Sequence, residues 1–344
     1  MAAYDYDLPP ELIAQEHARP RDASRLLVVR GDALEHRRFS ELPNLLRPDD
    51  LLVLNDTRVI AARISGRRFP TGGKVEVLLL RPATNPTYDT RATRWLALVK
   101  PGRTARPGDR IEFDRFGSAT VEAIARDGMR VLALDLRVPL EEFLNAAGRL
   151  PLPPYVRSDS ERNQEDYQTI FGVRPGSVAA PTAALHFTER TFSDLERRGI
   201  ETCTLTLQVG LATFRPMRTP SIDAHQMHVE AFDIPIDTAR RIDAAKNAAR
   251  RVVAVGTTVV RALEAAAEED GTVCAGAACT GLFITPGFRF RVVDALLTNF
   301  HLPRSTLLVL VSAFAGRGRM LRAYEEAVRL RYRFFSFGDA MLIF

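Results

Sequence analysis

Hydrophobic and polar residues alternate differently in the middle of this chain and at its two ends. Between Ala61 and Arg137, short apolar runs such as "GGKVEVLLL" and "MRVLALDL" are separated by Gly, Pro and Asp. Short strands punctuated by turn residues are typical of an all-β unit. This segment therefore predicts a small barrel or sandwich.

The flanking segments predict alternating strands and helices. "DDLLVLN" predicts a short buried strand that ends at Asn55, and "LEEFLNAAG" predicts a helix closed by Gly148. Further along, "VVAVG" followed by "TTVVRALEAAAEEDG" predicts a buried strand, a tight turn and a helix. This alternation favours an α/β body with a partly parallel sheet. We therefore expect an α/β (mixed sheet) domain formed by residues 1–60 and 138–344, with an all-β barrel domain inserted at residues 61–137.

Composition narrows the class of protein. The 344 residues are 46% hydrophobic and 26% charged, with a formal net charge of +5, which permits a polyanionic partner such as RNA without requiring one. Three cysteines without a C-x-x-C pair indicate neither a disulfide framework nor a zinc site. No apolar run reaches the roughly 20 residues that a membrane span needs. We expect a soluble, cytoplasmic protein without a signal peptide or membrane contact.

Polar residues follow two of the predicted strands. Asp56 and Arg58 come directly after the strand that ends at Asn55, and in "LLTNFHLPRST" Asn299 and His301 follow an apolar strand. Ligands of open α/β sheets bind beyond the carboxyl ends of the strands, which makes both groups candidates for a site. An Asx-type turn with a surface arginine is the alternative interpretation of the first group.

Two further segments carry candidate chemistry. Thr257 and Thr258 stand where a strand gives way to a helix, so the free N–H groups there can hold a carboxylate or phosphate; plain N-capping is the alternative. His228 and Glu230 lie in "HQMHVEAF", whose order differs from a metalloprotease H-E-x-x-H, and no further ligand is evident. We expect contact with substrate or fixation of a loop there, and no metal.

His186 lies in the apolar stretch "GSVAAPTAALHFTE". Taken alone, such a histidine is more typical of a core residue with one satisfied hydrogen bond than of a catalytic group. Other segments of the sequence favour the catalytic interpretation. "LLVLNDTRVIAAR", "GSVAAPTAALHFT", "HQMHVE", "VVAVGTTVVRALE" and "YRFFSFGDAMLI" occur in this order along almost the whole chain. Together they resemble the S-adenosylmethionine:tRNA ribosyltransferase-isomerase family of queuosine biosynthesis.

The resemblance implies a reaction and an architecture. The ribosyl part of S-adenosylmethionine is moved onto 7-aminomethyl-7-deazaguanine at the wobble position of the tRNA anticodon loop. The product is epoxyqueuosine, with release of adenine and methionine. S-adenosylmethionine is consumed as a substrate, so we expect no cofactor. An α/β catalytic domain with an inserted β-barrel is implied as well, and we expect a monomer.

Under this resemblance each candidate residue receives a role. A base must remove a proton next to the sulfonium, and histidine is the usual agent near neutral pH, so we expect His186, Asp56 and Arg58 to be catalytic. Arg67 and Arg68 are expected to bind tRNA phosphates. The residues expected to bind S-adenosylmethionine or the acceptor are Thr182, Gln208, His228, Glu230, Thr257, Thr258, Asn299 and His301.

Three residues depart from the family pattern. Ala184 and Ala212 stand where the family has glycine, and Gln208 stands where it has histidine. These departures keep two alternatives open: a paralogue that uses S-adenosylmethionine with a different acceptor, and a non-catalytic tRNA-binding protein. The second would bind tRNA with a steep salt dependence yet release no adenine.

Overall fold

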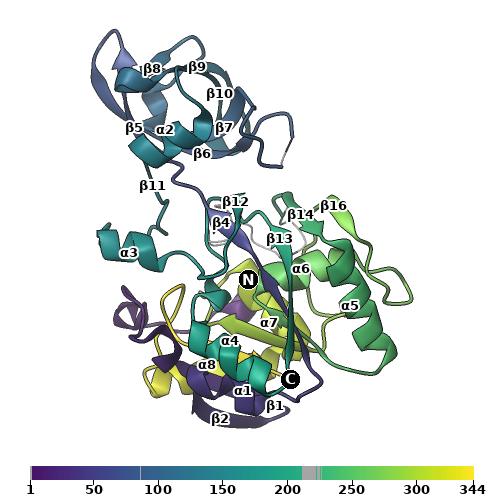
Figure 1. Ribbon diagram of the computed structural model, residues 1–344. Coiled ribbons are helices and arrows are strands. Elements are labelled where there is room, and N and C mark those ends of the chain that lie inside the picture. Colours follow the sequence, from purple (N-terminus) through teal and green to yellow (C-terminus); the bar gives the residue numbers. More distant parts are fainter. Residues whose placement is uncertain (1, 86, 211–221, 223–224, 226) are drawn as a thin grey trace.

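The computed structural model describes residues 2–85, 87–210, 222, 225 and 227–344, so Ala212 lies outside the described part. It contains a mixed sheet covered by helices and a separate β-barrel, which stands above the sheet in Figure 1. None of the helices in the described ranges is long and apolar enough to cross a membrane. All three cysteines are free thiols.

The larger sheet is nine-stranded. Its strands, in their order across the sheet, are β16 (Gly276–Thr280), β14 (Glu230–Ile234), β13 (Glu201–Leu207), β3 (Leu51–Asn55), β15 (Val252–Val255), β17 (Ala295–Asn299), β18 (Ala340–Ile343), β1 (Arg25–Arg30) and β2 (Ala33–Arg38). The neighbours β13, β3, β15 and β17 are parallel. β18 is antiparallel to β17 and parallel to β1, which makes the sheet mixed.

Apolar cores cover both faces of this sheet. Side chains of a strand point to opposite faces in turn, so Leu51 and Val53 join one core whereas Leu52 and Leu54 join the other. This double burial explains why the central strands are uninterrupted apolar runs. The first core is closed by α5 (Ile236–Asn247), α6 (Thr257–Ala265), α7 (Thr306–Ala315) and α8 (Arg317–Arg329). The second is closed by α1 (Leu42–Leu45) and α4 (Glu189–Arg197).

The barrel is built from six antiparallel strands, and the pairing of β5 with β8 closes it. Closure leaves no free strand edge. Trp95 is fully buried in its core, and Phe143 of α2 (Leu140–Ala147) packs on Phe113 with ring centroids 5.1 Å apart. The all-β prediction is confirmed, and the unit is a barrel, not a sandwich. Its strands are β5 (Arg63–Phe69), β6 (Gly73–Pro82), β7 (Arg94–Lys100), β8 (Arg110–Glu112), β9 (Gly117–Ile124) and β10 (Arg130–Leu136).

Two segments run between the barrel and the sheet. β4 (Thr57–Val59) continues from β3 and pairs in parallel with β12 (Arg174–Ser177), and Figure 1 shows this pair below the barrel. On the return path, β11 (Gly148–Arg149) pairs with β5, and α3 (Glu161–Asp166) follows.

The backbone of Gly148 does not have the left-handed conformation expected of a glycine that closes a helix. Its φ is −90°, which is ordinary extended backbone. A Cβ there would lie 1.9 Å from the carbonyl oxygen of Ala61, so the close approach of two backbone segments requires glycine. Gly199, which follows α4, does have the left-handed conformation, with a φ of +69°.

Candidate active site

Several of the candidate residues lie at one edge of the mixed sheet. The carboxyl ends of the parallel strands β3, β13, β15 and β17 meet there, so Asp56, Gln208, Thr257 and Asn299 stand at the ends of neighbouring strands. Asn55 ties these ends together. Its Nδ2 donates to the carbonyl oxygen of Leu207 at 3.0 Å, and its Oδ1 accepts from the backbone N–H of the same residue.

Asp56 is the carboxylate at this edge. It retains 8% exposure, and Thr206 Oγ1 donates to its Oδ1 at 2.6 Å. Burial raises the pKa of Asp56, while hydrogen bonds from Thr206 and Thr204 and the charge of Arg174 act in the opposite direction. Within the described part of the chain, no cationic nitrogen lies within 4.0 Å of this carboxylate. A carboxylate that is unpaired and partly desolvated is a good proton acceptor near neutral pH.

Arg58 leaves β4 and lines a cavity of about 490 Å³ between the barrel and the sheet. Its side chain is exposed, and its Nη1 lies 3.4 Å from the carbonyl oxygen of Gly172. The chain therefore carries Asp56 at the sheet edge and Arg58, two residues on, at the cavity.

His186 has no exposed surface. Its Nε2 accepts from Asn299 Nδ2 at 3.2 Å, and its Nδ1 lies 2.9 Å from Ser24 Oγ; the ring stacks on Phe39 with centroids 5.0 Å apart. Burial lowers the pKa of His186 to about 3, and the charges of Arg333 and Arg21 act in the same direction. A neutral imidazole with both nitrogens engaged contacts no substrate in this conformation. The geometry favours a positioning role, through Asn299, over the catalytic role expected from the sequence.

His301 is also enclosed by protein. Its Nε2 lies 2.9 Å from Thr298 Oγ1, and its backbone N–H donates to the hydroxyl of Tyr324 at 3.0 Å. Burial lowers the pKa of His301 to about 3. The interactions of this imidazole are therefore internal to the protein in this conformation.

These buried histidines predict acid sensitivity. An unfolded histidine takes up a proton near its ordinary pKa of 6.5, whereas folded His186 and His301 do so only at about 3. Between these values the unfolded state binds more protons, so stability falls as the pH drops below 6.5. Each histidine should cost about 2 kcal/mol of unfolding free energy at pH 5. Urea unfolding of His301→Gln at pH 7 and pH 5 should show about that much less pH dependence than the wild type. The full wild-type dependence in His301→Gln would contradict the prediction, and exposed His228→Gln serves as the control.

Thr257 and Thr258 do not cap α6, so the N-capping alternative is wrong. Gly256, with a φ of +95°, occupies the N-cap, and Thr257 and Thr258 belong to the first helical turn. Thr258 Oγ1 lies 3.4 Å from Asn55 Nδ2. The first N–H groups of a helix have no partner within it, so this turn keeps the donors that the anion-binding prediction requires. Thr182 is partly exposed, in the 3₁₀ turn η8 (Thr182–Ala184).

Glu230 lies in a buried ion pair. Its Oε2 bonds to Arg261 of α6, and its Oε1 accepts from the backbone N–H of Gly210 at 2.8 Å. Only 6% of each charged side chain is exposed, and Arg261 Nε also donates to the carbonyl oxygen of Leu282 at 3.1 Å. The sequence analysis missed Arg261. The signal for a buried partner was an arginine between the apolar residues Val260 and Ala262.

Gln208 connects the sheet to the barrel. Its Oε1 accepts from the backbone N–H of Tyr88 at 2.9 Å, and Tyr88 lies in the connection between β6 and β7. His228 is exposed. Partial burial of His225 lowers the pKa of its imidazole, and the nearby His228 acts in the same direction. Among the described residues, no three His, Cys, Asp or Glu side chains are grouped so as to hold a metal ion.

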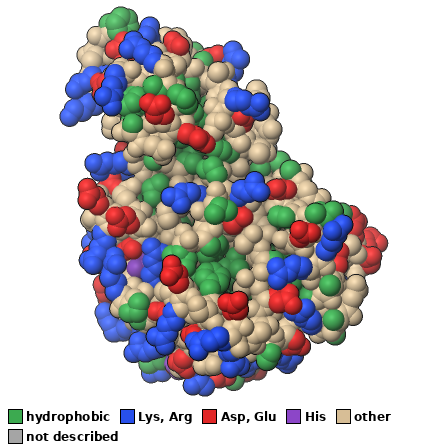
Figure 2. Space-filling model, viewed as in Figure 1, with side chains coloured by type: hydrophobic (Ala, Val, Ile, Leu, Met, Phe, Trp, Pro, Cys, Tyr) green, Lys and Arg blue, Asp and Glu red, His purple; other side chains and the backbone are tan. Residues whose placement is uncertain are grey.

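Arg67 and Arg68 lie on β5, away from the sheet edge. Arg67 Nη1 donates to the carbonyl oxygen of Gly72 at 3.3 Å, and Arg68 Nε donates to Thr71 Oγ1 at 3.2 Å. Arg67 also lines a surface cavity of about 760 Å³ together with Lys74 and Lys100. Figure 2 shows Lys and Arg side chains on the barrel, with acidic side chains between them.

Comparison with known proteins gives the family. The sequence model of the family described as "Queuosine biosynthesis protein" matches residues 1–343. The chain belongs to this family. A relative from Gloeobacter violaceus is 52% identical over 99% of this chain and 95% of its own length. Another from Symbiobacterium thermophilum is 51% identical over 100% of this chain and 99% of its own. Both are named S-adenosylmethionine:tRNA ribosyltransferase-isomerase.

A solved structure agrees with the queuosine family assignment. The crystal structure of S-adenosylmethionine tRNA ribosyltransferase from Thermotoga maritima is 37% identical to this chain, with a TM-score of 0.55. It covers 99% of this chain, and this chain covers all of it (100%). The resemblance to the queuosine family inferred from the sequence is therefore confirmed.

Two of the three departures from the queuosine family pattern fall on described residues. Ala184 is 1% exposed, and its methyl group belongs to an apolar core with Phe187 and Leu297, so it does not crowd a ligand there. Gln208 retains a hydrogen bond, to the barrel.

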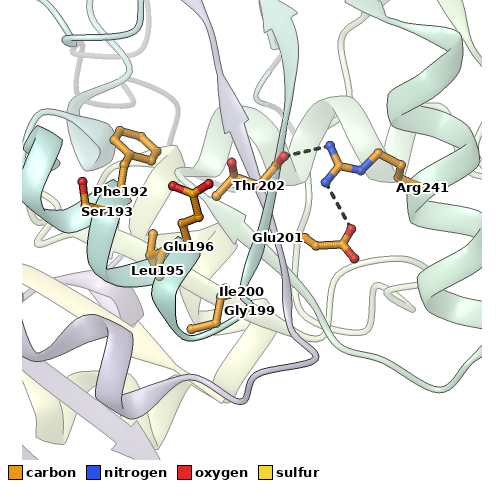
Figure 3. A pocket seen from close by; sticks show the side chains of 9 residues that line it. All are labelled: Phe192, Ser193, Leu195, Glu196, Gly199, Ile200, Glu201, Thr202 and Arg241. Carbon is orange, nitrogen blue, oxygen red and sulfur yellow. Dashed lines mark hydrogen bonds and ion pairs between the residues drawn. The ribbon is translucent and has the colours of Figure 1, made fainter.

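A third cavity, of about 470 Å³, lies at the opposite, amino end of β13 (Figure 3). Arg241 donates to the carbonyl oxygen of Thr202 at 2.8 Å and pairs with Glu201 at 3.1 Å. This bond, and the neighbouring charge of Arg250, hold the pKa of Glu201 below its usual range. None of the residues expected to carry queuosine-family chemistry lines this cavity, and these charges are matched within the protein.

Proposed function

We propose that this chain transfers the ribosyl part of S-adenosylmethionine onto 7-aminomethyl-7-deazaguanine at the tRNA wobble position, giving epoxyqueuosine and releasing adenine and methionine. The observation that carries this proposal is the name of relatives that are about half identical along essentially the whole chain. The polar edge of the mixed sheet supports it because open α/β sheets bind ligands at the carboxyl ends of their strands.

Asp56 is our assignment for the base that removes a proton next to the sulfonium. Asp56 retains 8% exposure at the sheet edge and its carboxylate accepts from Thr206, whereas His186 has no exposed surface. The first turn of α6, at Thr257 and Thr258, supplies N–H donors for the methionine carboxylate. S-adenosylmethionine is the ribosyl donor, and we propose no separate cofactor.

We propose that the tRNA binds to the barrel. Residues 61–137 form an inserted domain whose Arg67 and Arg68 contact phosphates near the anticodon loop, since such contacts orient a nucleic acid without reading its sequence. We propose that the protein acts as a monomer in the cytoplasm, without membrane contact.

Adenine release tests the function directly. Purified protein with S-adenosylmethionine should release adenine with an anticodon stem-loop that carries 7-aminomethyl-7-deazaguanine, and the RNA should gain the matching mass. A stem-loop with guanine at the wobble position is the control and should give no release. If S-adenosylmethionine binds but neither stem-loop triggers release, the paralogue with another acceptor is favoured. Binding of tRNA without binding of S-adenosylmethionine would favour the non-catalytic alternative.

A further inference from the structure

The cavity beside Arg58 lies between the two parts of the molecule. Its volume of about 490 Å³ suits a small ligand, since ligand pockets commonly measure about 300–1,000 Å³ and lie at such junctions. β4 and the segment before β12 contribute one side, and the barrel with α2 contributes the other. The polar side chains that line it are Arg58, Tyr88, Glu141, Asn145, Gln164, Glu165 and Gln168.

Some of these side chains are committed to the protein. The amide of Gln164 exchanges two hydrogen bonds with the backbone of Leu150, at 2.7 and 3.1 Å. Gln168, also in the wall, does the same with Val59, at 3.1 and 2.7 Å. These two glutamines fix the wall and leave recognition to the remaining groups.

The charged side chains that line the cavity form no ion pair with one another or with other described residues. Arg58, Glu141 and Glu165 line one cavity, yet within the described ranges none of the three has a partner of opposite charge within 4.0 Å. All three side chains are exposed, and Arg58 Nη1 donates to the carbonyl oxygen of Gly172. Charged groups of a ligand in the cavity can therefore form charge-assisted hydrogen bonds with them.

Tyr88 fixes the geometry of the cavity on the barrel side. Gln208 accepts from its backbone N–H, and its ring packs edge-on against Trp95 with centroids 5.9 Å apart. Burial raises the pKa of Tyr88 to about 12, and the charge of Glu141 adds to this. Glu141 and the neutral phenol of Tyr88 thus line the same cavity, and Tyr88 is held in place from both parts of the molecule.

We propose that this cavity is the pocket for the acceptor base, with Glu141 binding the aminomethyl group of 7-aminomethyl-7-deazaguanine. This inference rests on the proposed function. A primary alkyl amine is protonated at neutral pH, so a carboxylate is its natural partner. Arg58, on the opposite wall, suits a phosphate of the same RNA. Because Arg58 follows Asp56 by two residues, a base in this cavity lies next to the sheet edge assigned to the donor.

Stem-loop binding tests this assignment without turnover. Anisotropy of labelled stem-loops, in the absence of S-adenosylmethionine, should show that the wild type prefers 7-aminomethyl-7-deazaguanine to guanine. Glu141→Gln keeps the shape but removes the charge, and it should reduce that preference by about tenfold or more, the value of one charge-assisted hydrogen bond. Glu142→Gln is the matched control, because Glu142 is its exposed neighbour on the same helix and does not line the cavity.

The possible outcomes separate this inference from the proposed function. A wild-type preference that persists in Glu141→Gln overturns the assignment. So does a rise in KM for S-adenosylmethionine with an unchanged preference, since the cavity would then hold the amino group of the donor. If the wild type releases adenine on the modified stem-loop, either result rejects this inference alone. Failure of the wild type to release adenine would reject the proposed function itself.

Discussion

Asp56→Asn is expected to lower kcat for adenine release by about 10²–10⁴-fold, the usual contribution of a general base. Asparagine has nearly the same shape, and its Oδ1 can still accept from Thr206. The fold and the KM for S-adenosylmethionine should therefore change little. Single-turnover rates with the modified stem-loop measure the effect, and Asp237→Asn, an exposed carboxylate on α5, is the control. Wild-type turnover by Asp56→Asn would remove this carboxylate from the chemistry.

Thr206→Val provides an independent check on Asp56. The threonine hydroxyl stabilises the ionised carboxylate, so its removal should raise the pKa of Asp56 further. Because only the ionised form accepts a proton, the acidic limb of the pH–kcat profile should move to higher pH in Thr206→Val. A purely structural role of Asp56 would leave the position of that limb unchanged.

Glu230→Ala is expected to destabilise the protein by about 3–5 kcal/mol, the usual cost of removing one member of a buried ion pair. Arginine cannot release its proton in a protein, so the Arg261 guanidinium would remain charged and buried. Gly210 would also lose the acceptor of its backbone N–H. Urea unfolding measures the loss.

The double variant Glu230→Leu/Arg261→Met is the control for this prediction. It removes both charges and fills the same space with apolar atoms, which is often neutral in energy. It should therefore recover most of the stability lost in Glu230→Ala. Equal destabilisation of the single and the double variant would show that the charge left on Arg261 is not the cause.

Local patterns in the sequence were sufficient for the strands and for the two kinds of architecture. The short apolar runs in "GGKVEVLLL" and "LLVLN" are properties of neighbouring residues, and both became strands as predicted. Gly148 shows the limit of this reasoning. Glycine is required at position 148 because a Cβ there would collide with the carbonyl oxygen of Ala61. Ala61 lies far earlier in the chain, before the first barrel strand.

Side-chain partners at the candidate site could not be predicted for the same reason. The hydrogen bonds of His186 connect it to Ser24, 162 positions away, and to Asn299, 113 positions away. Glu230 finds Arg261 across 31 positions. A sequence shows that a polar residue stands among apolar ones, but only the packed fold shows whether another part of the chain satisfies it.

The single tryptophan of the chain, Trp95, is buried in the barrel, whereas most helices flank the mixed sheet. The protein thus carries two spectroscopic signals that report on different parts of one molecule. Tryptophan emission follows the barrel, and far-ultraviolet circular dichroism follows mainly the helical part. Unfolding curves recorded both ways reveal whether the barrel and the sheet melt as one cooperative unit. If they do not, Glu230→Ala should lower the unfolding midpoint that circular dichroism reports and leave the midpoint that tryptophan fluorescence reports unchanged.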